Sequence, residues 1–195
     1  MSLAHRNYFD EIAVEWNDRV QTDPCLAKHI KNFGIHPTDR VLDIGAGTGR
    51  LSKVLIRQIQ KPGAVVALDF AQKMLTRAQS ELGNTAQYIC ADACELVFRD
   101  NTFHKVICYS TFPHILEPQQ ALNEIYRVLK PQGKLLILHN CCSKKLNDFH
   151  SSLNPVVCRD ILPLAKKLKI LLEQIGFDCK TAEHPDLYWV EAIKE

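Results

Sequence analysis

The sequence predicts an α/β fold in which helices cover both faces of a largely parallel sheet. Along most of its 195 residues, short apolar runs rich in β-formers alternate with segments of helical period. Gly and Pro punctuate the joins between them. This alternation is typical of βαβ units. The length fits one domain, and we assign residues 1–195 to it.

The first segment is predicted to be helical, because its apolar residues fall on one helical face. These residues are Tyr8, Phe9, Ile12, Ala13 and Trp16. Asp23 and Pro24 predict the start of a second helix, which ends at Gly34. We interpret residues 1–36 as an N-terminal helical lid.

Five apolar runs predict the central strands. They are residues 40–44, 64–68, 86–90, 105–109 and 134–139. Three segments between them have apolar residues at helical spacing. They are residues 51–59, 74–82 and 121–129, which end at Lys61-Pro62-Gly63, Gly83-Asn84 and Lys130-Pro131-Gln132-Gly133 respectively.

The last third of the chain is organised differently. Residues 140–160 are polar and irregular, and we expect them to cover the acceptor side of the sheet. A helix over residues 164–175 follows, ending at Gly176. Two short runs, 177–182 and 187–193, are joined by only four residues. A link that short requires an antiparallel pair.

Composition excludes several classes of protein. A net charge of +2 argues against a histone-like or polyacidic chain. No apolar run approaches the roughly 18 residues of a membrane span, and the N-terminus does not resemble a secretory signal. The eight cysteines are irregularly spaced, so a disulfide framework is not expected. We therefore expect a soluble, cytoplasmic protein, either monomer or homodimer.

The most informative stretch is VLDIGAGTGR, residues 41–50, in which a buried strand runs into three alternating glycines and then a helix. A dinucleotide fingerprint would place its third glycine at Arg50, and a P-loop would require Lys-Ser/Thr after the glycines. An S-adenosylmethionine loop fits better, because Asp43 at the strand end suits a cationic ligand. A tight turn without a ligand is the remaining alternative.

Two further acids follow predicted strands. Asp69 comes twenty residues after Gly49 and can accept both hydroxyls of a ribose. Asp92 ends the next strand and could accept an adenine amino group. Each alone could be a helix cap or a turn residue. Three acids at consecutive strand ends favour a nucleoside site.

With these motifs in place, the sequence resembles the class I S-adenosylmethionine-dependent methyltransferases, in the small ubiquinone-biosynthesis-like branch. The resemblance covers about residues 7–140 and rests on VLDIGAGTG, ALDFAQKML, ADACEL and RVLKPQGKLLI. It implies a Rossmann-like, doubly wound sheet of seven strands in the order 3-2-1-4-5-7-6, with strand seven antiparallel and helices on both faces.

The resemblance also implies roles for individual residues toward the cofactor, S-adenosyl-L-methionine. Asp43 would orient the glycine loop, and Asp69 would bind the ribose. The residues implied to cradle the methionine portion are Gly45, Ala46, Gly47 and Gly49. Those implied on the adenine side are Phe70, Met74, Asp92 and Ala93. Ser110 and Thr111 would approach the methyl donor, and Tyr8 and Trp16 resemble lid aromatics, with core packing as the alternative.

Two departures caution against importing the quinone substrate of that branch. Phe103-His104-Lys105 stands where the branch usually has Phe-Asp, and Leu96-Val97-Phe98 stands where it usually has Leu-Pro-Phe.

The expected reaction is methyl transfer to a small-molecule acceptor by in-line displacement. His114 is a candidate base or acceptor ligand, with a surface position as the alternative. No Asn-Pro-Pro-aromatic signature follows the fourth strand, and no acidic cluster there suggests magnesium. Aromatic interleaving is sparse, so nucleic acid is an unlikely partner.

The segment leaving the fifth strand carries His139, Cys141, Cys142 and then His150. We interpret His139, with His114, as a candidate catalytic residue. The spacing matches no structural zinc pattern, so we assign no metal ligands. The alternatives are methylation of RNA or protein, handling of a metal or metalloid through these residues, and, more distantly, an NAD-dependent reductase.

Overall fold

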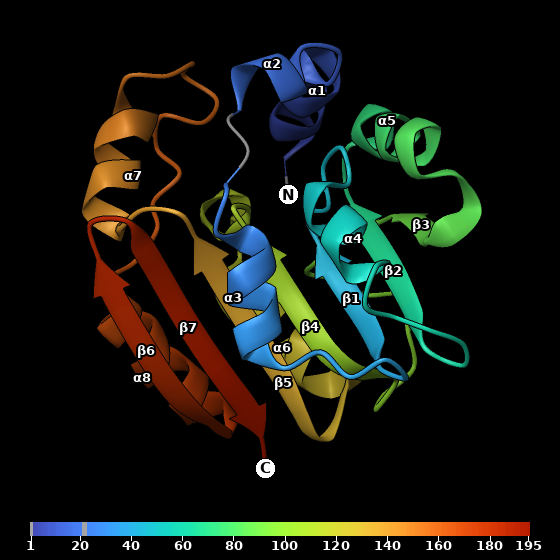
Figure 1. Cartoon of the computed structure of the whole chain (residues 1–195). Coiled ribbons are helices and arrows are strands. Elements are labelled where there is room, and N and C mark those ends of the chain that lie inside the picture. The colour runs from blue at the N-terminus through green and yellow to red at the C-terminus, as the bar shows by residue number, and fades with distance from the viewer. Residues whose placement is uncertain (1, 21–22) are drawn as a thin grey trace.

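A computed structural model describes residues 2–20 and 23–195. Its seven strands form one sheet in the order β3-β2-β1-β4-β5-β7-β6 (Figure 1). The strands are β1 (Arg40–Ile44), β2 (Ala64–Asp69), β3 (Gln87–Cys90), β4 (Phe103–Tyr109), β5 (Leu129–His139), β6 (Phe177–His184) and β7 (Leu187–Lys194). Pairs from β3 to β5 are parallel, whereas β7 is antiparallel to both β5 and β6. The predicted order and the antiparallel β7 are therefore confirmed.

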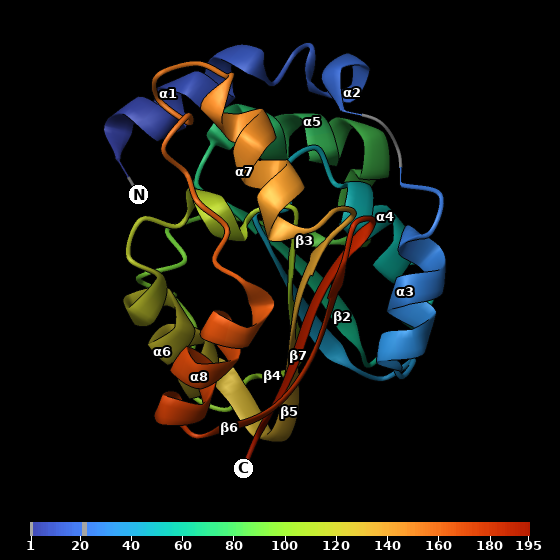
Figure 2. The ribbon, with the colours of Figure 1, turned by 90° about the vertical axis from the view of Figure 1, so that its left-hand side faces the viewer.

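Helices cover both faces of this sheet (Figure 2). The main helices are α3 (Leu26–Phe33), α4 (Arg50–Leu55), α5 (Gln72–Leu82), α6 (Pro118–Val128) and α8 (Ala165–Ile175). Apolar side chains of α3 and α4 pack with Val41 and Val65, and Leu75 of α5 packs with Ala67, so these helices share one face. Helices α6 and α8 pack on the alternate residues, such as Leu42 and Val66, which face the other way.

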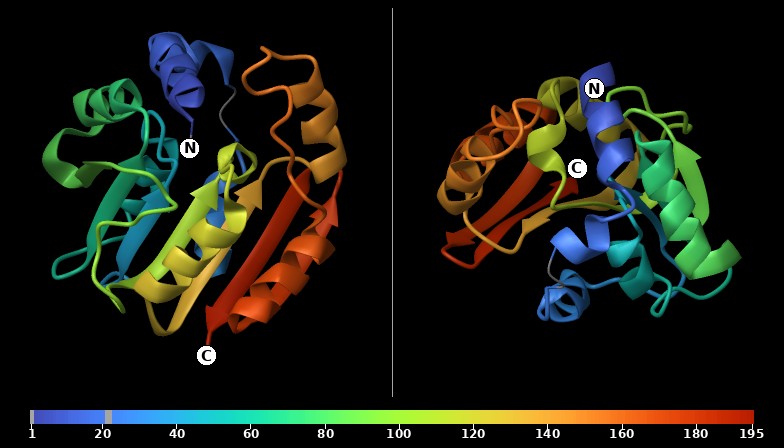
Figure 3. Two further views of the ribbon diagram at one scale, coloured as in Figure 1. Left: turned by 180° about the vertical axis from the view of Figure 1, so that it is seen from behind. Right: turned by 90° about the horizontal axis from the view of Figure 1, so that it is seen from above.

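Three helices lie beyond the carboxyl ends of the parallel strands (Figures 1 and 3). They are α1 (Leu3–Ile12), α2 (Trp16–Arg19) and α7 (Ser143–Ser151). Phe9 of α1 packs against Phe70, which follows β2, and against Val157. Two segments from opposite ends of the chain thus meet over this edge of the sheet. None of the helices in the described part of the chain is long and apolar enough to cross a membrane.

The single helix predicted through Trp16 is wrong. The chain leaves α1 after Ile12, makes a turn in which Glu15 N–H donates to Ile12 O at 3.1 Å, and forms α2 separately. Apolar residues from both sides of the turn pack into one cluster, so their spacing does not reveal the break.

The start of the second predicted helix is also wrong, by two residues. Helix α3 begins at Leu26, because the Asp23 carboxylate accepts the Cys25 N–H at 2.8 Å and closes a turn before it. Gly34, with φ 78°, ends that helix as predicted.

Residues 140–160 are not wholly irregular, because they contain α7. This helix buries only Ser143 and His150, so it has no apolar face that a sequence pattern could display. Strand β5 also begins earlier than predicted, at Leu129, which pairs with Phe103 ahead of a register shift.

Candidate functional site

The glycine loop lies between β1 and α4, at the carboxyl edge of the sheet. The N–H groups of Gly45 and Ala46 both donate to Leu68 O, at 2.8 and 3.0 Å, which holds the loop against the end of β2. Gly45 has φ 69°, and a Cβ placed on it would overlap the side chain of Thr111. Glycine is therefore required at position 45 so that the segment after β4 can approach the loop.

The other two glycines have different surroundings. A Cβ on Gly47, whose φ is 54°, would have only Trp16 Nε1 near it, at 3.9 Å, so this position borders open space. A Cβ on Gly49 would lie 2.7 Å from Leu82 Cδ1 of α5. Gly47 is thus the position where a ligand can approach the backbone, whereas Gly49 allows α4 and α5 to pack closely.

Asp43 is the second-last residue of β1, directly before the glycine loop, and is buried. Its Oδ2 accepts a hydrogen bond from the Ser52 hydroxyl at 2.7 Å. Burial raises the pKa of Asp43 to about 7, although the Ser52 hydrogen bond opposes this. A buried acid beneath the loop is suited to stabilising a nearby cation once it is ionised.

Asp69 ends β2 and faces the same loop. Its Oδ2 accepts the Gly47 N–H at 2.8 Å, and its Oδ1 accepts the Ala71 N–H at 2.9 Å. Burial raises the pKa of Asp69 to about 6, against the effect of these hydrogen bonds. The adjacent Phe70 and Met74 are buried in one cluster with Phe9, which gives the carboxylate an apolar neighbourhood.

The third acid, Asp92, follows β3 and closes a turn in which its Oδ1 accepts the Cys94 N–H at 2.9 Å. Ala93 beside it is buried. All three predicted acids therefore lie at or just beyond the carboxyl ends of neighbouring strands, at one edge of the sheet.

Ser110 and Thr111 follow β4 on the opposite side of the loop. Ser110 is exposed and has a left-handed backbone with φ 54°, which is uncommon for a residue with a side chain. Such strained positions gather at ligand sites.

Two small cavities, of about 40 and 60 Å³, flank the indole of Trp16 beside the glycine loop. Both are bordered by Trp16, Gly45, Gly47 and Ser110, and the smaller also by Asp69 and His114. Pockets that bind small ligands and cofactors usually have volumes of roughly 300–1,000 Å³. The N-terminal aromatic residue therefore occupies the cleft, and it must move when a nucleoside enters.

A cluster of histidines adjoins this cleft. His114 Nδ1 lies 2.6 Å from Asp160 Oδ2, and His5 Nε2 lies 3.1 Å from Asp160 Oδ1. His150 Nδ1 donates to the backbone carbonyl of Asp160 at 2.8 Å, and the rings of His114 and His150 are 5.1 Å apart. One buried carboxylate thus organises imidazoles from three separate segments.

His139, the last residue of β5, is buried, and its Nε2 has no hydrogen-bond partner among the described residues. Burial, and then the neighbouring His114 and His150, lower its pKa to about 3. His139 is therefore a neutral hydrogen-bonding group. A buried ring nitrogen without a partner is energetically costly, so a polar group that reached His139 would be stabilising.

The two cysteines of this segment do not join the cluster as a metal centre. Cys142 takes the N-cap position of α7, and burial raises the pKa of Cys141. Across residues 2–20 and 23–195, no group of three or more His, Cys, Asp or Glu is arranged to hold a metal ion.

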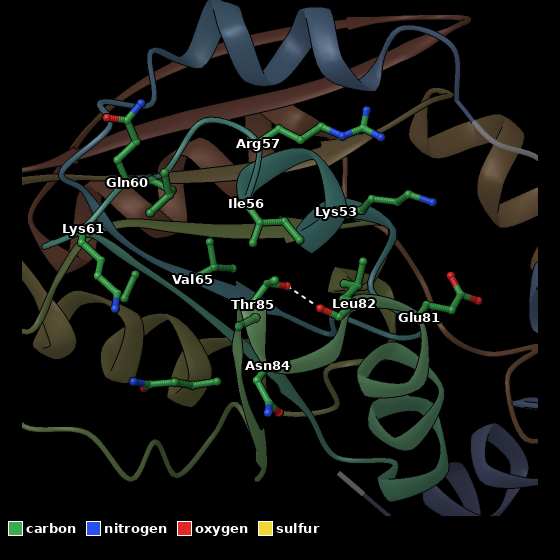
Figure 4. A pocket seen from close by; sticks show the side chains of 15 residues that line it. Lys53, Ile56, Arg57, Gln60, Lys61, Val65, Glu81, Leu82, Asn84 and Thr85 are labelled. Atoms are coloured by element: carbon green, nitrogen blue, oxygen red, sulfur yellow. Dashed lines mark hydrogen bonds between the residues drawn. The ribbon is translucent and has the colours of Figure 1, made fainter.

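A wider cleft of about 700 Å³ lies at the amino ends of β2 and β3, on the opposite edge of the sheet (Figure 4). Lys53, Arg57 and Lys61 line it together with Glu81 and Asn84. No residue predicted for the cofactor or acceptor borders it. The candidate site is therefore the cleft at the glycine loop.

Asp160 and His5 were not predicted as site residues. They are 155 positions apart in the chain, and His114 is 46 from Asp160, so no local motif could connect them. The only feature of the sequence that pointed to Asp160 was its place in residues 140–160, the polar segment expected to cover the acceptor side.

Comparison with known proteins matches residues 42–137 to the methyltransferase domain family. The chain is 35% identical over 143 residues to the ubiquinone/menaquinone biosynthesis C-methyltransferase UbiE of Wigglesworthia glossinidia brevipalpis, covering 64% of this chain and 56% of that protein. It is 36% identical over 178 residues to UbiE of Teredinibacter turnerae, covering 85% of this chain and 69% of that one. The chain thus spans little more than half of the first relative and about two thirds of the second.

Among solved structures, a SAM-dependent methyltransferase from Aquifex aeolicus superposes with a TM-score of 0.74 at 20% identity. The match covers 97% of this chain and 98% of the other, so the two share the fold over nearly their whole length.

Proposed function

The chain belongs to the class I S-adenosylmethionine-dependent methyltransferases of the ubiquinone-biosynthesis-like type, and from this membership we propose that it transfers a methyl group from S-adenosylmethionine to a small-molecule acceptor. The observation that carries the proposal is the open face of Gly47 beside the carboxylate of Asp69. A side chain at position 47 would fill the space next to the Asp69 carboxylate, which is suited to binding ribose hydroxyls. Once Trp16 moves aside, the cleft can take a nucleoside with an amino-acid tail.

In this proposal the cofactor supplies a methyl group on a positively charged sulfur. Asp43 orients the glycine loop and faces the ammonium side of the cofactor, and Asp69 accepts the ribose hydroxyls. Phe70 and Met74 pack beside the adenine, with Asp92 and the Ala93 N–H at its polar edge. Gly45, Ala46, Gly47 and Gly49 shape the loop, and Ser110 and Thr111 border the reacting centre.

The protein's main contribution is then alignment and exclusion of water. Helices α1 and α2 are the proposed lid, as part of residues 1–36, of which 1, 21 and 22 lie outside the described residues. The segment 140–160 covers the acceptor side. The names of the relatives specify carbon methylation, but the departures at residues 96–98 and 103–105 argue against carrying their quinone substrate over to this chain.

We further propose that the protein works as a monomer or homodimer in the cytoplasm. The small net charge of +2 disfavours a nucleic-acid acceptor.

Calorimetric titration with S-adenosylmethionine and, separately, with NAD tests the cofactor assignment. We expect binding of the first and none of the second. Formation of S-adenosylhomocysteine with small acceptors, compared with RNA and with protein extract, then tests the class of acceptor. Binding of NAD alone would contradict the proposal, and turnover only with RNA or protein would favour that alternative.

A further inference from the structure

The carboxylate of Asp160 fixes the state of His114 at the edge of the cofactor cleft. An ionised carboxylate only accepts hydrogen bonds, so the nitrogen that faces it carries a proton. Burial opposes ionisation of Asp160, but hydrogen bonds from His114 and His5 outweigh it and hold its pKa below the ordinary value. His114 therefore has its proton on Nδ1, 2.6 Å from Asp160 Oδ2.

The other ring nitrogen of His114 is left available. Among the described residues, none makes a hydrogen bond with His114 Nε2, while the side chain borders the cavity that also touches Gly47, Asp69 and Thr111. A basic nitrogen with a lone pair thus lies at the site where methyl transfer is proposed. This is the arrangement of a general base held in one tautomer by a carboxylate.

His5 on the same carboxylate is arranged differently. Its Nε2 faces Asp160, and its Nδ1 lies 2.7 Å from the Ser2 hydroxyl. Both of its ring nitrogens are therefore occupied within the fold. His5 is therefore a structural histidine, whereas His114 keeps one ring nitrogen without a hydrogen-bond partner among the described residues.

Resting on the function proposed above, we propose that His114 and Asp160 form an acid–base dyad whose acceptors must lose a proton from oxygen or sulfur, such as phenols, enols and thiols. In the step, the acceptor atom forms a bond to the methyl carbon, and the carbon–sulfur bond breaks with its electron pair staying on sulfur. The acceptor proton moves to His114 Nε2, and the resulting imidazolium later releases it to water. Asp160 is a positioning residue that stabilises this imidazolium.

We include His139 in the proposed acceptor side of the site. Its buried Nε2 has no described partner, and the ring is close enough to His114 and His150 to interact electrostatically with both. Because His139 is buried and lines neither cavity at the glycine loop, we propose that it supports the acceptor side from behind, as a neutral hydrogen-bonding group.

The first test measures the tautomer of His114 directly, without an acceptor. Nitrogen-15 NMR of the S-adenosylhomocysteine-loaded protein should give one His114 signal pair with Nδ1 protonated and Nε2 bare. Loss of that pair in His114→Gln assigns it, and His184→Gln, at an exposed site, should leave it unchanged. We expect Asp160→Ala to abolish the single tautomer. A wild-type His114 protonated on Nε2, or an unchanged tautomer in Asp160→Ala, would overturn the dyad.

The second test measures turnover with hydroquinone and 2-mercaptoethanol as O–H and S–H probes. We expect Asp160→Ala and His114→Gln to lower kcat about 100-fold to 10,000-fold, as loss of a general base does, with cofactor affinity within about twofold. His5→Phe breaks the other contact of Asp160, and we expect its kcat to fall far less than that of Asp160→Ala, because His114 keeps its carboxylate partner. His184→Gln, at an exposed site, is the control that should leave kcat unchanged.

An equal loss in His5→Phe would make Asp160 a structural clamp only. Wild-type protein that binds S-adenosylmethionine but turns over neither probe would overturn the acceptor class. Failure of the wild-type protein to bind S-adenosylmethionine would instead contradict the proposed function itself, so the two failures are distinguishable.

Discussion

The Asp69 carboxylate accepts the backbone N–H of Gly47 at 2.8 Å, so the end of β2 holds the glycine loop directly. Each oxygen of Asp69 accepts one backbone N–H and keeps a second acceptor position, so ribose hydroxyls can bind while the loop stays attached. The carboxylate therefore positions the loop and is available to the nucleoside at the same time.

Replacement of Asp69 by Ala should weaken binding of S-adenosylmethionine. A buried carboxylate that makes two charge-assisted hydrogen bonds is worth about 2–4 kcal/mol. Calorimetry on the folded variant measures the change, and Asp178→Ala, at an exposed site on β6, is the control. An unchanged affinity in Asp69→Ala would remove the nucleoside assignment.

Substitution of Gly47 by Val should eliminate cofactor binding. The side chain would enter the space beside Trp16, and a β-branched residue strongly disfavours φ 54°. Gly34→Val is the matched control, because Gly34 has φ 78° with no atom within 4 Å of its added Cβ. The two variants should lose similar stability in urea denaturation, but only Gly47→Val should lose binding. Normal binding in Gly47→Val would mean that the loop is only a turn.

Asp43 should make the stability of the protein depend on pH. Burial raises its pKa from 3.8 to about 7, against the hydrogen bond from Ser52. Below pH 3.8 the carboxyl is protonated in both states. Between about pH 4 and 7 only the unfolded chain loses the proton, so the free energy of unfolding falls as pH rises. Above about pH 7 Asp43 is ionised in both the folded and the unfolded chain, so the free energy of unfolding falls no further through this group.

Asp43→Asn removes this titration while keeping an oxygen that can accept from Ser52. Urea denaturation of both proteins gives the difference in free energy of unfolding, wild type minus variant. We expect that difference to fall from about pH 4 to 7 and then to level off. A difference that stays constant or rises over this interval is the contrary result.

Trp16→Ala should speed the association of S-adenosylmethionine, because the indole separates the two cavities at the glycine loop. A protein whose competent state is rarely populated binds more slowly and more weakly than one already open. Surface plasmon resonance on the immobilised protein can follow association, with Val14→Ala, at an exposed site, as the control. An association rate equal to that of the wild type would mean that the cleft opens without moving Trp16.

The sheet was largely predictable, because its central strands β1, β2, β4 and β5 bury runs of apolar residues. Strand β1, for example, has its predicted bounds, since Val41 and Leu42 bury on opposite faces. Helix α7 was not predictable in this way. It is held by polar contacts such as Asn147 to the backbone of Leu162 at 3.0 Å, and these leave no periodic pattern.

The candidate site likewise has a part that local sequence predicts and a part that depends on long-range contacts. Glycines and acids at strand ends can be recognised locally, because the chain itself carries them to one edge of the sheet. Asp160 meets His114 and His5 only after distant segments pack together. The predicted cofactor residues could therefore be located from the sequence, whereas the contacts of Asp160 depend on the tertiary fold.

The strand order also has a consequence for synthesis of the chain on the ribosome. Strand β6 emerges before β7, yet in the sheet β7 lies between β6 and β5. Until β7 is translated, β6 has no neighbour to pair with, and the edge of β5 presents unpaired N–H and C=O groups, a template for pairing with other chains. Nascent chains stalled before residue 187 should therefore recruit chaperones or associate with one another, and translation of β7 should end that vulnerability.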